Sequence, residues 1–262
     1  MKTDNNYTNL ILQLTLTEFK LKYAGSVLGY IWTLVKPLLL FGVLYIVFTF
    51  FFKLGKGIPN YPVYLLVGVV MWAFFAESTM SALHSIVGRG DLIRKVNFPK
   101  IIITFAAALT ALLTFILNLV VIVVFMMTSK IGFSPINLLF IFLVFELFVF
   151  ILGLSFILST LFVKFRDFNH IWEVSLQVLF YGTPIIYPIA FIPEGVEKLI
   201  MLNPLAQIFQ DARWVLVSTD VETSWEVLGW PLNLLPPLIV FGLFVFGLIL
   251  FQKSAKNFAE EL

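Results

Sequence analysis

Long apolar segments constrain this chain more than any other feature of its sequence. A helix needs about 20 mainly apolar residues to cross the hydrocarbon core of a membrane. Because 60% of the residues are apolar and only 12% are charged, the composition excludes a soluble enzyme, a nucleic-acid-binding domain and a disordered tail. We therefore expect an all-α integral membrane protein, with residues 1–262 forming one transmembrane domain of six helices. The six expected spans are Ile31–Phe52, Tyr64–Val87, Ile101–Met127, Leu138–Val163, Ile171–Ile189 and Leu234–Phe251.

Positive charges predict how these spans are oriented, because Lys and Arg accumulate on the cytoplasmic side of membrane proteins. With the N-terminus in the cytoplasm, 12 of the 17 Lys and Arg residues fall on the inner side. We therefore expect both termini to be cytoplasmic. The N-terminal segment has no signal-peptide pattern, so the first span is expected to stay in the protein.

Residues 1–29 precede the first span and carry two apolar stripes at helical spacing. A helix with two such stripes can lie on the membrane and still present one face to a protein partner. The alternative is a plain interfacial anchor helix. One stripe comprises Tyr7, Leu10, Ile11, Leu14 and Leu21, and the nearly opposite one comprises Leu12, Leu16, Phe19 and Tyr23, with Lys20 between them.

The segment 88–100 predicts a short cytoplasmic helix over Asp91–Phe98. Asp91 suits an N-cap, Asn97 suits a helix end, and Pro99 suits the start of the next helix. Held between two spans, such a helix is a rigid lever that a cytoplasmic partner could push. The alternative is a positive loop that only sets the topology. The candidate lever residues are Asp91, Leu92, Ile93, Arg94, Lys95, Val96, Asn97 and Phe98.

The segment 184–232, which overlaps the end of the fifth expected span, contains the longest stretch between spans, and we place it on the outer side. Four Pro residues, at 184, 188, 193 and 204, break it repeatedly. Apolar residues recur at helical spacing between the breaks, which predicts two short amphipathic helices that dip into the outer leaflet. Such backbone must be sheltered by protein or line a wet cavity, which favours a gate; the alternative is a lid on the membrane surface.

Three carboxylic acids and a histidine lie within the expected spans, at Glu77, His84, Glu146 and Glu173. Charges there are costly and usually face the interior of the bundle. The carboxylates would suit a proton-coupled carrier. The alternative is a helix–helix hydrogen bond or an ion pair with Arg89 or Arg94.

Catalytic chemistry has no recognisable motif in this chain. The sequence has neither a Gly-rich phosphate loop nor a His-Glu-x-x-His motif, and it has no cysteine. We therefore expect a transport subunit rather than an enzyme, with no cofactor or metal of its own. Aromatic side chains near the span ends could stack on sugars and so form a glycan conduit. These candidates are Trp32, Tyr45, Trp72, Phe74, Phe75, Phe180, Tyr181 and Tyr187.

Four segments, taken together and in this order, resemble a known family. The family is the permease subunit of ABC exporters of lipid-linked polysaccharides, the O-antigen and wall teichoic acid group. The resemblance covers nearly the whole chain. The segments are Lys20–Pro37, Leu92–Pro99, Phe165–Phe168 and Phe180–Tyr187, the last continuing through Pro193 and Pro204 to Arg213.

This resemblance implies a bacterial cytoplasmic (inner) membrane protein that works as a homodimer with two ABC ATPase subunits, which bind ATP and magnesium. Residues 4–23 would be the interface helix, Asp91–Phe98 the coupling helix, and residues 184–217 the outer gate helices. The lipid-linked glycan would pass between the two permeases, among membrane lipids, and no nucleic acid is involved. The alternatives are an exporter of drugs or other lipids, a proton-coupled carrier, and a membrane enzyme of glycan assembly.

Overall fold

The computed structural model describes residues 1–262 except 1–2, 25–28, 30, 54–57, 97 and 194. Every regular element in these described parts is helical, which confirms the all-α membrane class. The longer helices are α1 Thr3–Tyr23, α2 Ile31–Ile46 (prolonged by a π-helical turn, Val47–Phe51), α3 Tyr61–Ser85, α5 Ile101–Thr128, α6 Leu139–Lys164, α7 Phe168–Gly182, α9 Pro204–Leu216 and α11 Leu235–Ser254. The short ones are α4 Gly90–Lys95, α8 Val196–Met201, α10 Ser224–Leu228 and α12 Phe258–Glu261.

Among the described residues, five helical stretches are long and apolar enough to cross a membrane. They match five of the six expected spans. The expected span Ile171–Ile189 is wrong at its end, because α7 stops at Gly182. Thr183 is extended, as the residue before a proline tends to be, and Pro184 has no N–H with which to continue the helix.

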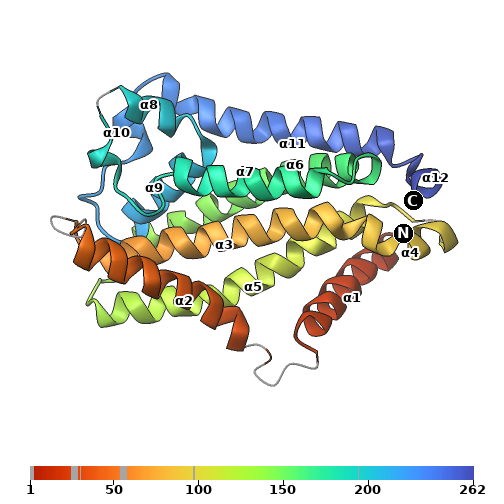
Figure 1. Ribbon diagram of the computed structural model, residues 1–262, viewed down its shortest axis with the longest axis horizontal. Helices are drawn as coiled ribbons and strands as arrows, with labels where there is room; N and C mark the ends of the chain where they lie inside the picture. The colour runs from red at the N-terminus through yellow and green to blue at the C-terminus, as the bar shows by residue number, and fades with distance from the viewer. Residues whose placement is uncertain (1–2, 25–28, 30, 54–57, 97, 194) are drawn as a thin grey trace.

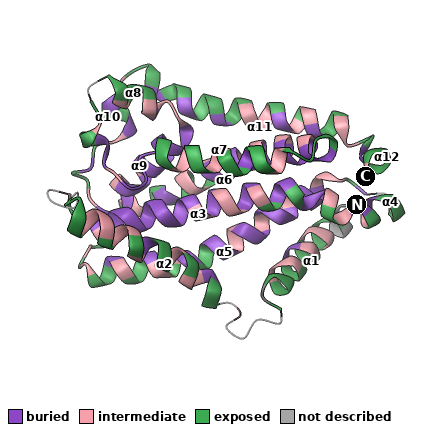
Figure 2. Ribbon diagram, in the orientation of Figure 1, coloured by how far each residue is buried: buried purple, intermediate pink, exposed green. Residues whose placement is uncertain are grey.

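α3 forms the centre of the bundle, with α5 and α6 as its main neighbours and α11 packed on the far side of α6 (Figure 1). Figure 2 shows buried residues along the length of α3, whereas most residues of α2 are exposed or only partly buried. Glycines allow α6 and α11 to approach closely. A Cβ added at Gly247 would lie 2.3 Å from the carbonyl oxygen of Gly153.

The two ends of the bundle differ in construction (Figure 1). At one end, which we call the α4 end, α4 and α12 contact each other and α1 approaches the bundle. The opposite end, the α9 end, carries α8, α9 and α10, which follow α7 and precede α11 along the chain. The expected amphipathic helices of segment 184–232 are thus confirmed as helices.

Candidate functional site

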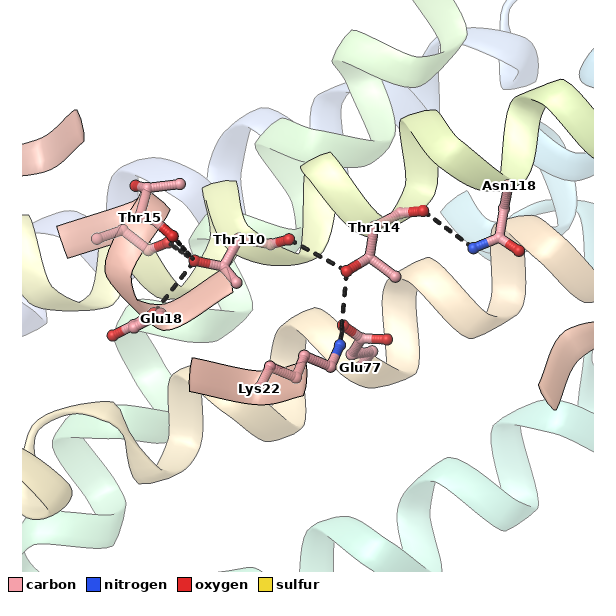
Figure 3. A network of polar contacts seen from close by, with 8 residues as sticks. Thr15, Glu18, Lys22, Glu77, Thr110, Thr114 and Asn118 are labelled. Carbon is pink, nitrogen blue, oxygen red and sulfur yellow. Dashed lines mark hydrogen bonds and ion pairs between the residues drawn. The ribbon is translucent and has the colours of Figure 1, made fainter. Parts of the chain in front are cut away.

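A ladder of polar contacts holds α1 against the bundle (Figure 3). Thr110, Thr114 and Asn118 are spaced by four residues and so lie on one face of α5. The Thr110 hydroxyl lies 3.3 Å from the backbone oxygen of Thr15 and 3.2 Å from Oε2 of Glu18. Asn118 donates to the carbonyl of Thr114 (2.9 Å), which extends the polar face along α5.

Two ion pairs tie the same helix to α3 and to the residues that follow it. Glu18 pairs with Arg89, and Lys22 pairs with Glu77. The alternative of an ion pair with Arg89 or Arg94 therefore does not hold for Glu77, because α1 supplies the cation. Burial raises the pKa of the Glu18 carboxyl, while the guanidinium of Arg89 and a hydroxyl of α5 act in the opposite direction.

A cavity of about 250 Å³ opens beside the Lys22–Glu77 pair, between α1, α2, α3 and α5. Lys36 also lines it and has no ion-pair partner among the described residues. Trp32 and Asn118 complete its polar rim. The cavity therefore combines two cations, one carboxylate and an indole with the polar side chains of Thr33, Thr114 and Asn118 and with apolar residues.

The outward face of α1 carries the second apolar stripe. Leu12 and Leu16 are half exposed, Lys20 is exposed and Phe19 is partly buried, whereas the side chain of Tyr23 lies outside the described residues. Three members of the first stripe pack against the core instead, namely Leu10, Ile11 and Leu14. One apolar face thus docks on the bundle while the other remains available to lipid or a partner.

The short helix predicted over Asp91–Phe98 is present as α4, but it begins earlier than expected and already ends at Lys95, because Val96 is extended. α4 starts at Gly90, so Asp91 lies inside its first turn and its expected role as N-cap is wrong. The preceding 3-10 turn, Val87–Arg89, leads straight into the helix and moves its start forward. The Asp91 carboxylate instead pairs with Arg94 at 3.0 Å.

The side chains of this segment face two ways. Ile93 and Phe98 are buried in the chain's own core, and Leu92 is half buried. The exposed members are Asp91, Arg94, Lys95 and Val96, while Asn97 lies outside the described residues. α12 contacts α4 at the end of the chain, and its Phe258 is fully buried. α12 therefore braces the helix, which leaves three charged residues and Val96 exposed for a partner.

At the α9 end, Arg213 fixes the broken segment after α7. Its guanidinium is fully buried and donates to the backbone oxygens of Pro184 and Ile185, both at 2.6 Å. It also donates to the hydroxyl of Tyr64 (2.9 Å) and lies over that ring. Gly68 makes room for it, because a Cβ there would lie 2.6 Å from Nη2. Two backbone carbonyls just beyond the end of α7 thus accept hydrogen bonds from the buried guanidinium of Arg213.

The eight candidate conduit aromatics fall into separate groups. Trp32 and Phe74 line the cavity beside the Lys22–Glu77 pair, and Tyr45 lines another cavity at the opposite end of α2. Trp72 packs on Phe75 and on Phe180, with centroids 5.5 and 5.4 Å apart.

Their exposure also differs. Phe75 is completely buried in its own chain and has no surface to offer a substrate in this conformation. Tyr181 is the most exposed of the eight, and Tyr187 donates to its backbone oxygen at 2.9 Å. A conduit lined by the exposed members stays a prediction.

The remaining ionisable residues have local surroundings. Glu173 accepts from Asn169 (3.0 Å) and lies 3.6 Å from His170, so its contacts are within α7 rather than between helices. The exposed ring of His84 packs edge-on against Phe162. Glu146 has one buried carboxylate oxygen without a hydrogen-bond partner among the described residues.

Sequence reasoning missed the polar ladder and the role of Arg213. The repeat of Thr110, Thr114 and Asn118 every four residues in an apolar span was the available signal for the ladder. Arg213 entered the sequence analysis only as the end of the fourth resembling segment, since no local pattern predicts which carbonyls will surround it.

Known proteins resemble this chain along most of its length. The model of the ABC-2 type transporter family matches residues 9–217. The O-antigen export system permease protein RfbA of Klebsiella pneumoniae is 31% identical over 261 residues, covering 97% of this chain and 95% of the relative. The protein of that name from Myxococcus xanthus is 32% identical, with 98% and 96% covered. The polysialic acid transport protein KpsM of Escherichia coli is 22% identical, with 93% and 92% covered.

Proposed function

This chain belongs to the ABC-2 type transporter membrane family, and on that premise we propose that it is the transmembrane subunit of an ATP-driven exporter of lipid-linked polysaccharide. Relatives named for O-antigen export and polysialic acid transport support a polysaccharide exporter subunit. The family implies an ABC ATPase as the partner. ATP and magnesium would therefore be bound by that separate chain, at the cytoplasmic face of a bacterial inner membrane, where both termini of this chain would lie.

The exposed tip of α4 carries the proposal that ATP hydrolysis is coupled to this subunit. Arg94 and Lys95 in the last turn of α4, and the extended Val96 that follows it, are exposed, whereas Gly90 and Ile93 of the same helix are buried. A push on this tip would reach α3 and α5 directly, because α4 lies between the ends of those two helices. Asp91, paired with Arg94, would keep the tip helical.

Val96→Asp tests the coupling role without disturbing the core, because Val96 is exposed. The new carboxylate would have no partner where the tip of α4 contacts the ATPase. It should therefore reduce both the stimulation of ATP hydrolysis and export about tenfold or more. The measurement is ATP hydrolysis and vesicle export by the complex of permease and ATPase. Val196→Asp, at an exposed valine of α8, is the matched control and should retain the stimulation. Full activity of Val96→Asp would leave segment 88–100 as a topology signal only.

Two exposed helix faces support a homodimer with the glycan path between the copies. α2 exposes one apolar row and α7 exposes another, each at helical spacing. Trp32 and Tyr181 lie on these same two helices, which supports stacking of the glycan in the path. The rows are Leu39, Val43, Ile46 and Phe50 on α2, and Ile171, Val174, Val178 and Tyr181 on α7.

Disulfide cross-linking tests the dimer cleanly, since the chain has no native cysteine. Cysteine at Val43 or Val178 should give a covalent dimer on oxidation in membranes. Leu238→Cys, on the exposed side of α11, is the control and should remain monomeric. Cross-linking at Leu238 but at neither of the other sites would contradict the proposed pairing faces.

A further inference from the structure

A second cavity, of about 640 Å³, opens at the α9 end among α6, α9, α10 and the start of α11. It lies apart from the Lys22–Glu77 pair and from α4, and the proposed function does not use it. Its chemically distinctive lining residues are Gln207, Asp211, Trp214, Trp225, Glu226 and Asn233. No Lys, Arg or His lines it, so the lining as a whole is acidic.

The polar floor of this cavity is held in a fixed arrangement. The Asp211 carboxylate accepts from the side chain of Gln207 (2.9 Å) and from both the backbone N–H and the hydroxyl of Ser224, at 2.8 and 2.7 Å. Thr223 and Glu226 form a capping box at the start of α10. The site is therefore organised before any ligand arrives, which lowers the entropy cost of binding.

Two buried acceptors in the lining have no donor. Oε1 of Gln207 and Oδ1 of Asn233 make no hydrogen bond with any described residue, although the two side chains are only 5% and 9% exposed. An unpaired buried acceptor is unfavourable, so a ligand that brings hydrogen-bond donors is favoured here. The carboxylates of Asp211 and Glu226 add a preference for positive charge.

The aromatic and apolar lining residues indicate which kind of cationic ligand fits the cavity. Trp214 and Trp225 line the cavity, and indole faces attract ammonium groups. Leu139 and Phe142, also in the lining, are exposed on the outer surface of α6, where a membrane protein meets acyl chains.

We propose that this cavity binds the primary ammonium headgroup of a phospholipid from the adjoining leaflet, with the ethanolamine group as the ligand. Its three N–H donors match the free oxygens of Gln207 and Asn233, and its charge matches the carboxylates. The acyl chains would then run along Phe142. A neutral sugar would supply donors but would leave the acidic floor without a cation.

Native mass spectrometry of the purified protein tests this binding. The probes are phosphatidylethanolamine, phosphatidylcholine and phosphatidylglycerol at equal concentration. The ethanolamine lipid should be retained at least about tenfold better, because the choline group has no N–H donor and the glycerol group has no charge. Equal retention of the ethanolamine and choline lipids would overturn the proposal.

Variants locate the lipid on the protein. Asn233→Leu removes a side chain with an unpartnered oxygen and should abolish the preference for the ethanolamine lipid. Gln252→Leu, at an exposed position near the opposite end of α11, is the control and should keep that preference. Trp225→Ala is a second variant at a largely exposed position and should weaken retention without affecting the fold. An undiminished preference in both Asn233→Leu and Trp225→Ala would place the lipid elsewhere and refute this site.

Discussion

α3 and α2 are both apolar enough to span the membrane, yet their surroundings are opposite. In the most apolar 18-residue stretch of α3, 78% of the residues are buried inside the protein. In the corresponding stretch of α2 and its π-helical turn, 6% are buried. α3 is the less apolar of the two and carries Gly68, Glu77 and Ser78. In water the more apolar helix would be the buried one. In a bilayer, lipid solvates apolar side chains as well as protein does, so polar and small residues determine which helix is central.

Matched substitutions on the two helices test whether this contrast in surroundings controls stability. If burial within the protein controls the outcome, the α3 member of each pair loses stability and the α2 member does not. If hydrophobicity alone controls it, the two members respond alike. Reversible unfolding of the purified protein in detergent supplies the free energy of unfolding for each variant.

The tryptophans should give the largest contrast. Trp72 of α3 is 8% exposed and packs against Phe75 and Phe180, whereas Trp32 of α2 is 39% exposed. Trp72→Ala should lower the free energy of unfolding by about 3–5 kcal/mol through the cavity it leaves. Trp32→Ala should cost less than about 1 kcal/mol. Similar losses in both variants would show that α2 is also packed against protein.

The glycines should give the next largest contrast. A Cβ at Gly68 of α3 would lie 2.6 Å from Arg213 and 3.2 Å from the backbone oxygen of Ile185, whereas one at Gly42 of α2 would meet nothing within 4 Å. Gly68→Val should therefore destabilise the protein by roughly 1–3 kcal/mol through overpacking. Gly42→Val is the control, and a loss of the same size there would contradict the exposed placement of this face of α2.

The charged residues should give the smallest contrast. Glu77→Gln leaves Lys22 without its carboxylate, but both side chains of this pair are about one-third exposed, so we expect a loss of about 1 kcal/mol or less. Lys36→Gln, on α2, should have no measurable effect. The swapped pair Lys22→Glu with Glu77→Lys should recover part of the loss. If the swap is no better than Glu77→Gln alone, the two side chains do not interact in the folded protein.

Sequence reasoning succeeded where a single physical length controls the outcome. Membrane thickness fixes how many apolar residues a span needs, so five spans were predictable. The end of α7 was misplaced because the apolar run continues past Gly182, while the backbone breaks at Thr183 and Pro184. A hydropathy profile does not detect that break, because the residues beyond it are still apolar. The proline at 184 is the feature of the sequence that marks it.

Contacts between distant segments were less predictable than the helices. Glu77 required a cation, and Arg89 and Arg94 are close to it in sequence, but the observed partner is Lys22, 55 residues away. Which of several lysines reaches a carboxylate depends on how α1 crosses α3 and α5. That crossing is set by the whole packed bundle and has no local sequence signal.

The docking of α1 has a consequence for how the chain is made. Its partners emerge from the ribosome later than α1 itself, since Glu77, Arg89 and Thr110 follow their α1 contacts by 55, 71 and 92 residues. A nascent chain that ends before α5 holds Glu18 and Lys22 without the ladder, so α1 has to wait at the membrane surface. Its final placement is therefore a late step of biogenesis, completed only after three of the spans have been synthesised.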